Sequence, residues 1–298
     1  MKKNAFARRS ALAAAAGVVL VLAGCAVKIK PAAPAAPAKP AGTVLEYKMP
    51  AGRTLTYLGK GQESQVMEVM GQANDTQTAS TSTFTFKSKG LKDKNFLIGV
   101  TLDDMAVTVT SSMQGDMSPD MNAVKGKSFD MILSPLGSEV DVTGAEAITY
   151  EMAGETRSVA SGFKAFFPDM PAKPVQIGDT WPSNATVEEK TGSINIKIDT
   201  QNVNTLEGFE TIDGMNCARI SADVTGTISG TGNQGGMDLT FSGTVKGKDI
   251  YYFAVKEGLY VKSVSEAASQ LSIDVPAAGM TIPATQTSKG EITLSARK

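Results

Sequence analysis

Polar and apolar residues alternate with a period of two along most of the chain after residue 43. Such alternation is typical of antiparallel strands with one buried face and one solvated face. The pattern therefore predicts a mainly β fold, with curved antiparallel sheet in a half-barrel-like arrangement. The predicted strands cover residues 54–58, 81–87, 96–100, 105–110, 128–133, 193–199, 237–241, 250–255, 259–264, 271–275 and 291–294.

Glycine-containing pairs separate many of these runs. Asp213-Gly214 lies between two short alternating runs. Because both residues tolerate positive φ, this pair predicts a hairpin turn. Lys89-Gly90, Gly235-Gly236 and Glu257-Gly258 are predicted turns because glycine marks breaks between the alternating runs.

One stretch departs from the period of two and predicts a helical plug around residues 145–168. Thr143 and Glu146 match a capping box, and Pro168 would end the helix. The plug either fills the concave face of the sheet or acts as a lid over a cavity. Its apolar stripe is Ile148, Met152, Val159, Phe163, Phe166 and Phe167, of which Val159, Phe163, Phe166 and Phe167 are the candidate contacts for an apolar ligand.

Two pairs of similar segments suggest an internal duplication. Residues 49–51 resemble residues 170–172, and residues 84–90 resemble residues 241–247, but the two pairs have different offsets. We therefore predict an N-terminal β half with the helical segment (43–169) and a C-terminal β half (170–298), and leave the duplication open.

The N-terminus has the layout of a secretory signal peptide. Four basic residues precede an apolar run over residues 11–22, which is shorter than the roughly 20 residues of a membrane span. We predict a signal peptide over residues 1–24. Residues 25–42 follow as a tether whose four prolines favour an extended chain.

The sequence Leu22-Ala23-Gly24-Cys25 resembles the lipobox of bacterial lipoproteins. The resemblance implies cleavage between Gly24 and Cys25 and attachment of fatty acyl chains, such as palmitate, to Cys25. Ala26 after the cysteine resembles the sorting rule for the outer membrane, which implies a periplasmic location in the cell envelope. The alternative is an ordinary signal peptide with an incidental cysteine.

Composition argues against most kinds of catalysis. The chain has no histidine, which removes Ser-His-Asp and Cys-His catalysis and histidine-ligated zinc. No catalytic, cofactor or metal motif stands out, so we expect a protein that is not an enzyme and needs no cofactor. Two alternatives stay open: a Cu(I) site at Met113, Met117 and Met121, and a hydrolase built on a distant carboxylate pair.

Charge and cysteine content narrow the class of partner. Residues 1–24 hold 4 of the 29 basic residues and no acidic residue, so the remaining chain has 25 basic and 30 acidic residues, a net charge of −5. This balance disfavours nucleic-acid binding. Cys217 has no partner cysteine once Cys25 is acylated, so we expect it to be a core residue, and we expect the same of Trp181.

Two further resemblances suggest a function. Residues 167–181, which end in Gly178-Asp179-Thr180-Trp181, are similar to a segment of uncharacterised bacterial lipoproteins with a β-rich second half. The overall pattern resembles the LolA, LolB and LppX half-barrel lipoproteins, which hold acyl chains between a curved sheet and helices. These resemblances imply a membrane-anchored lipoprotein that binds a lipid or other apolar ligand. The alternative is a structural lipoprotein with a filled core and a protein or polysaccharide partner.

Overall fold

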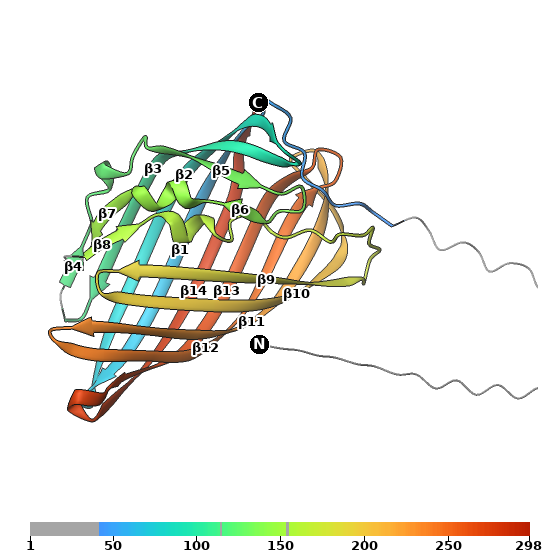
Figure 1. Cartoon of the computed structure of the whole chain (residues 1–298). Helices are drawn as coiled ribbons and strands as arrows, with labels where there is room; N and C mark the ends of the chain where they lie inside the picture. The colour runs from blue at the N-terminus through green and yellow to red at the C-terminus, as the bar shows by residue number, and fades with distance from the viewer. Residues whose placement is uncertain (1–41, 114, 153–154) are drawn as a thin grey trace, which may run out of the picture. The chain divides into compact units, whose positions relative to one another are not determined.

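The computed structural model describes residues 42–113, 115–152 and 155–298 (Figure 1). The predicted signal peptide, its cleavage site, Cys25 and almost all of the tether lie outside these residues. In the described part, fourteen strands form one antiparallel sheet with the order β6-β5-β3-β2-β1-β14-β13-β12-β11-β10-β9-β8-β7, and β4 pairs with β3. The mainly β, half-barrel-like prediction is confirmed.

The first and last long strands meet in the middle of the sheet, where β1 pairs with β14. The sheet curls so that β9–β12 cross in front of β1–β3, β13 and β14 (Figure 1). The long strands are β1 (Thr54–Val69), β2 (Gln72–Lys92), β3 (Asn95–Ser111), β9 (Thr180–Thr191), β10 (Ile194–Ile212), β11 (Met215–Gln234), β12 (Met237–Ala254), β13 (Leu259–Val275) and β14 (Met280–Arg297). The short strands are β4 (Gly115–Met117), β5 (Ser128–Leu133), β6 (Glu139–Asp141), β7 (Thr149–Met152) and β8 (Glu155–Ser158).

Several strands that the sequence predicts as separate are continuous in the structure. Residues 96–100 and 105–110 both belong to β3, where the alternation changes phase at Asp103. Asp104 pairs with Thr83 and Leu102 with Phe84, so Asp103 is the extra residue of a β-bulge. A bulge shifts the phase of side chains without ending the strand, which makes one strand look like two in the sequence.

The turn predictions have different outcomes. Asp213 and Gly214 have φ of 48° and 74° and join β10 to β11, which confirms the predicted hairpin. Turns also occur at Gly235-Gly236 and Glu257-Gly258. The turn predicted at Lys89-Gly90 is wrong, because β2 continues through it with a register shift between Ser88 and Gly90.

The predicted helical plug over residues 145–168 is also wrong. This stretch forms the β7–β8 hairpin and parts of two 3₁₀ turns, η2 (Thr143–Ala147) and η3 (Ala160–Phe163). The capping box is absent, because the Thr143 hydroxyl donates to Asp141 instead of capping a helix. Gly162 and β-favouring residues such as Thr149, Tyr150 and Thr156 weaken the helical alternative.

The core nevertheless forms where the plug was expected. We call residues 159–170 the inner segment. The Phe166 ring lies 4.9 Å from that of Phe86 and 5.5 Å from that of Tyr57, and the Phe163 ring lies 5.0 Å from that of Phe129 (centroid distances). This aromatic cluster fills one end of the inner face of the sheet.

Hydrogen bonds to the surrounding strands and loops hold the inner segment without a helix. The Tyr47 hydroxyl donates to the Pro168 carbonyl oxygen (2.9 Å), and the Met170 N–H donates to the Leu136 carbonyl oxygen (2.7 Å). The Phe167 N–H donates to Glu139 Oε1 (2.7 Å). These bonds satisfy backbone groups that a helix would otherwise pair internally.

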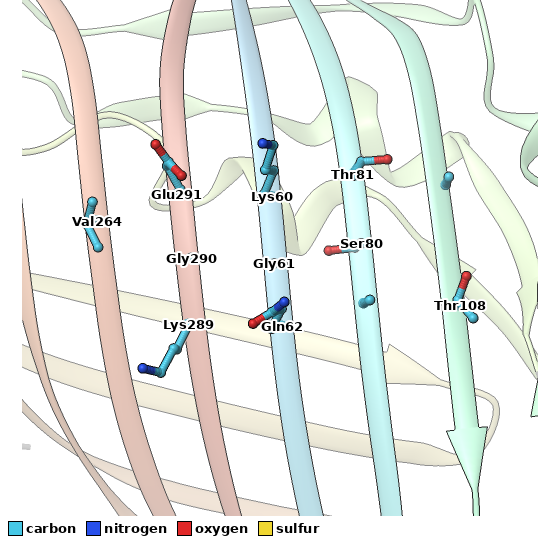
Figure 2. Close-up of a pocket in the computed structure, with 12 residues that line it drawn as sticks. Lys60, Gly61, Gln62, Ser80, Thr81, Thr108, Val264, Lys289, Gly290 and Glu291 are labelled. Atoms are coloured by element: carbon cyan, nitrogen blue, oxygen red, sulfur yellow. The ribbon is translucent and has the colours of Figure 1, made fainter.

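The outer face of the sheet is polar and carries cross-strand ion pairs. Lys289 lies 2.9 Å from Glu266, and Lys262 lies 3.0 Å from Glu291. A depression of about 450 Å³ on this face lies over Gly61 and Gly290, and Figure 2 shows the side chains around it.

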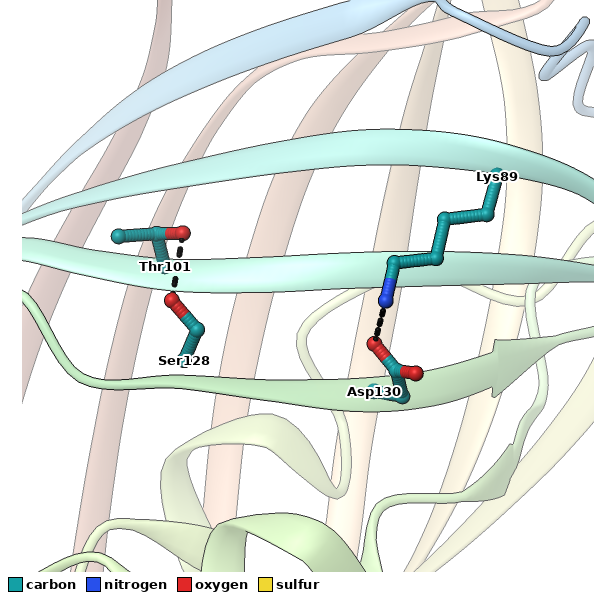
Figure 3. A network of polar contacts seen from close by, with 4 residues as sticks. All are labelled: Lys89, Thr101, Ser128 and Asp130. Carbon is teal, nitrogen blue, oxygen red and sulfur yellow. Dashed lines mark hydrogen bonds and ion pairs between the residues drawn. The ribbon is translucent and has the colours of Figure 1, made fainter.

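On the outer face, polar side chains link β5 to β2 and β3. Lys89 of β2 reaches across Gly99 of β3 to bond Asp130 of β5, and Thr101 bonds Ser128 at 2.9 Å (Figure 3). Both partners of the Lys89–Asp130 pair are half exposed, so its contribution to stability is small. The absent side chain of Gly99 allows the lysine to cross β3.

The two halves of the suggested duplication lie in one compact unit, residues 41–298. Residues 49–51 and 170–172 precede β1 and β9, whereas residues 84–90 and 241–247 lie in β2 and β12. β2 directly follows β1, but β12 is the third strand after β9. The duplication therefore stays a prediction.

The aromatic cluster predicts the effect of Phe163→Ala. Phe163 is 1% exposed, so we expect this substitution to lower the free energy of unfolding by about 3–5 kcal/mol. Phe209→Ala is the matched control, because Phe209 is 39% exposed and should lose far less. Urea denaturation followed by the fluorescence of Trp181, the one tryptophan of the sequence, measures both variants. Equal losses would contradict the cluster's role in the core.

Candidate functional site

A hollow lies between the inner face of the curled sheet and the inner segment. Its volume is about 620 Å³, within the range of small-molecule sites. Inward-facing residues of β9–β14 form one wall, and residues 164–169 form the other. The hollow exists because small side chains such as Ala222, Gly247 and Ala267 occupy much of the sheet wall.

The register of the sheet brings polar residues from separate strands into neighbouring rows. One row runs through Trp181, Asn204, Ala222, Asp249 and Ser265 on β9–β13. The next row places Asn202 opposite Ser183 on β9 and Val224 on β11. Residues that are far apart in the sequence therefore share one patch of the inner wall.

Asn204 is fully engaged within this patch. Its Nδ2 donates to the Trp181 carbonyl oxygen (3.2 Å) and to Ser183 Oγ (3.0 Å), and its Oδ1 accepts from the Tyr251 hydroxyl (3.2 Å). Asn204 is 3% exposed, so these bonds offset the cost of burying its amide. Its role is to fix the wall rather than to meet a ligand.

The Gly178–Trp181 motif supports the same wall. Gly178 has a φ of 88°, which glycine adopts readily. The Asp179 carboxylate accepts the Gln176 N–H (2.8 Å), and Trp181 Nε1 donates to the Asp169 carbonyl oxygen (3.1 Å). The motif thereby ties the start of β9 to the inner segment.

Two acceptors of the cavity wall remain without a donor. Asn202 Oδ1 is buried and has no hydrogen-bond partner. Among the residues that the structure describes, none forms a hydrogen bond or ion pair with the Asp249 carboxyl group, and desolvation raises the pKa of that carboxyl to about 6. An acceptor without a donor is unfavourable, so the Asp249 carboxyl group, which lines the cavity, is the place where a bound donor would gain most, whereas Asn202 Oδ1 is enclosed within the wall.

Two further carboxyl groups lie where the inner segment meets the wall. Burial raises the pKa of Glu139 to about 8, although the Phe167 N–H bond opposes the shift. Burial also raises the pKa of Asp169, whose Oδ1 accepts from the Ser138 hydroxyl (3.0 Å). At neutral pH Glu139 is mostly protonated and uncharged.

The rest of the lining is mixed. Val187, Ile198, Val224 and Val245 face the cavity from β9–β12, and hydroxyl groups such as those of Thr200, Ser263 and Ser265 also line it. Aromatic residues line it from both the sheet and the inner segment. The aromatic lining residues are Phe166, Phe167, Tyr251 and Tyr260. The cavity can thus hold a molecule with one polar end and one apolar end.

The sequence-predicted ligand contacts divide into two pairs. Phe166 and Phe167 line the cavity. Val159 and Phe163 are buried in the core and are not lining residues. Cys217 and Trp181 are buried, at 0% and 7% exposure, which confirms both as core residues.

Sequence reasoning missed Asn202, Asn204 and Asp249. A signal for Asp249 was present, because it occupies an inward position of β12 between Val245 and Phe253, where the alternation calls for an apolar or small residue. Asn202 and Asn204 fall in a polar stretch in which neither face is clearly apolar. Pairing with β11, which the sequence alone does not provide, assigns their face.

Comparisons with known proteins leave the family open. No family model and no curated protein matches the chain. Similar solved structures include a Bacteroides fragilis protein described as exported with a YMCC-like fold, at 7% identity and a TM-score of 0.26, covering 86% of this chain and 99% of the other. The COG4313 outer membrane channel from Pseudomonas putida matches at 8% identity and a TM-score of 0.25, covering 83% and 97%. A DUF1329 family protein from Desulfovibrio piger matches at 9% identity and a TM-score of 0.14, covering 82% and 87%. At these values the likenesses carry no argument about function.

The described residues contain no group of three or more His, Cys, Asp or Glu side chains arranged to hold a metal ion. They also contain no helix with the length and hydropathy of a membrane span.

The raised pKa of Asp249 predicts a pH-dependent cost to folding. Because its pKa in the folded state exceeds the unfolded value, the stability associated with its proton is present below about pH 4 and is lost as pH rises through about 6. Asp249→Asn removes this loss. We therefore expect the free energy of unfolding of the variant, relative to that of the natural protein, to rise by up to about 3 kcal/mol between pH 4 and pH 7.

Chemical denaturation at both pH values measures this gain. Asp223→Asn is the control, because Asp223 lies on the outer face with a side chain 76% exposed. A gain that is the same for both variants would show that Asp249 is not desolvated.

Proposed function

We propose that this protein is a non-enzymatic lipoprotein of the bacterial cell envelope that binds an amphipathic small molecule in the cavity between the sheet and the inner segment. The observation that carries the proposal is the cavity of about 620 Å³, which is lined by the unpaired carboxyl group of Asp249, by hydroxyl groups and by apolar side chains. A binding site needs such complementary surfaces but no reacting group.

The cavity is a better candidate than the depression on the outer face. The charged side chains Lys289 and Glu291 of that depression already have ion-pair partners, Glu266 and Lys262. The inner wall instead contains the Asp249 carboxyl group, which forms no hydrogen bond or ion pair with any described residue. A ligand with a donor group would therefore find an unpaired acceptor on the inner wall.

The membrane anchor belongs to the same proposal and rests on Cys25. Acyl chains on Cys25 would hold the protein at a membrane surface, since two or three chains give stable anchoring. The outer membrane is the proposed location because Ala26 follows the cysteine.

Cavity filling tests the binding function. We expect the full chain with Cys25→Ala, purified from bacterial cells, to carry a small molecule that native mass spectrometry detects and organic solvent removes. Val245→Phe should remove this added mass, because Val245 lines the cavity and a phenyl ring would occupy it. Val264→Phe, on the outer face, should retain it.

A protein without added mass that also takes up no amphiphile would contradict the binding function. That result would favour the alternative of a structural lipoprotein with a protein or polysaccharide partner. Equal retention by Val245→Phe and Val264→Phe would place the bound molecule outside the cavity.

Replacement of the acylated cysteine tests the anchor. We expect Cys25→Ala to move the protein from the membrane fraction to the soluble fraction of bacterial cells and to prevent labelling by a palmitate analogue. Cys217→Ala is the control, because Cys217 is buried and should affect neither result. Labelling that persists in Cys25→Ala would contradict the lipobox interpretation.

A further inference from the structure

The cavity offers an acceptor without a donor, and this asymmetry indicates the chemistry of its ligand. The Asp249 carboxyl group lines the cavity and has no hydrogen bond or ion pair with any described residue. By contrast, the amide of Asn204, in the same row of the wall, is satisfied on both sides. A molecule that brings N–H donors would complete the wall.

The charge of the lining points the same way. Three carboxyl groups line the cavity, those of Glu139, Asp169 and Asp249, whereas Lys164 is the one basic side chain in the described lining. Glu139 is mostly uncharged at neutral pH and Asp169 accepts a hydrogen bond from Ser138, which leaves Asp249 as the unpaired acid. A partly buried carboxylate without a counterion is unfavourable, and a bound cation would supply that counterion.

The aromatic lining residues suit a cation as well as an apolar chain. Phe166 and Phe167 line the cavity from the inner segment, opposite the polar rows, and Tyr260 lines it from β13; ring faces attract ammonium groups. Val187, Ile198 and Val245 extend the apolar lining beyond the polar rows. An ammonium head and an alkyl chain would therefore each find a matching surface.

We infer that the ligand of this cavity is a cationic amphiphile, whose protonated amine donates a hydrogen bond to Asp249 while its apolar chain lies against Val187, Ile198 and Val245. This inference rests on the proposed binding function and specifies its ligand class. A fatty acid would place its carboxylate beside Asp249, where the two negative charges repel. A fatty alcohol would supply one hydroxyl but no counter-charge.

Three probes of equal chain length separate these head groups: dodecylammonium, dodecanol and dodecanoate. We expect the full chain with Cys25→Ala to bind dodecylammonium about 10- to 100-fold more tightly than the other two, the range expected for hydrogen bonds to a charged group. Displacement of a fluorescent amphiphile at pH 7.5, with each probe below its aggregation concentration, measures the three affinities.

Substitutions in the cavity wall test whether Asp249 causes the preference for dodecylammonium. Asp249→Asn should reduce the affinity for dodecylammonium by about tenfold or more and leave that for dodecanol within about twofold, since it removes the charge but little volume. Asp223→Asn, which removes one negative charge from the outer face, should change neither affinity.

Two results would overturn the inference and keep the binding function: dodecanol or dodecanoate binding as tightly as dodecylammonium, or an ammonium preference that survives Asp249→Asn. A third result, in which none of the three probes displaces the fluorescent amphiphile, would overturn the inference and the proposed function together.

Discussion

The structure depends on how a curled sheet fills its own inner face. Curling turns one face of β1–β3 and β9–β14 inward, so side chains on that face must be covered by something other than water. At one end the aromatic cluster around Tyr57, Phe86 and Phe166 covers them. At the other end Phe241, Val275 and Ala284 are buried outside this cluster. Between the two ends small side chains leave the cavity.

The inner segment therefore has two roles that cannot be separated. Phe163 lies wholly within the core, whereas Phe166 and Phe167 belong both to the core and to the cavity lining. A change in these two rings would alter folding and binding together. Residues on the sheet side, such as Val245 and Asp249, change the cavity without entering the aromatic cluster, so they are the better probes of function.

Asp249 breaks the alternation that organises the rest of the sheet. Its inward position on β12 desolvates a carboxyl group, which costs stability at neutral pH. Sequences usually satisfy local rules except at functional sites, where an unfavourable residue is retained for what it binds. The unpaired Asn202 Oδ1 on β10 is a second departure of the same kind, enclosed within the wall, whereas Asp249 lines the cavity.

The sequence by itself determined the mainly β class, the half-barrel-like form and the Asp213-Gly214 hairpin, because alternation and turn residues act locally. It also identified the stretch that covers the inner face, since an apolar stripe must be buried whatever its backbone adopts. Tertiary structure decided that this stretch is not helical, because contacts with Tyr47, Glu139 and Leu136 satisfy its backbone. It also decided the cavity, because only strand pairing brings Asn202 and Asp249 onto one wall.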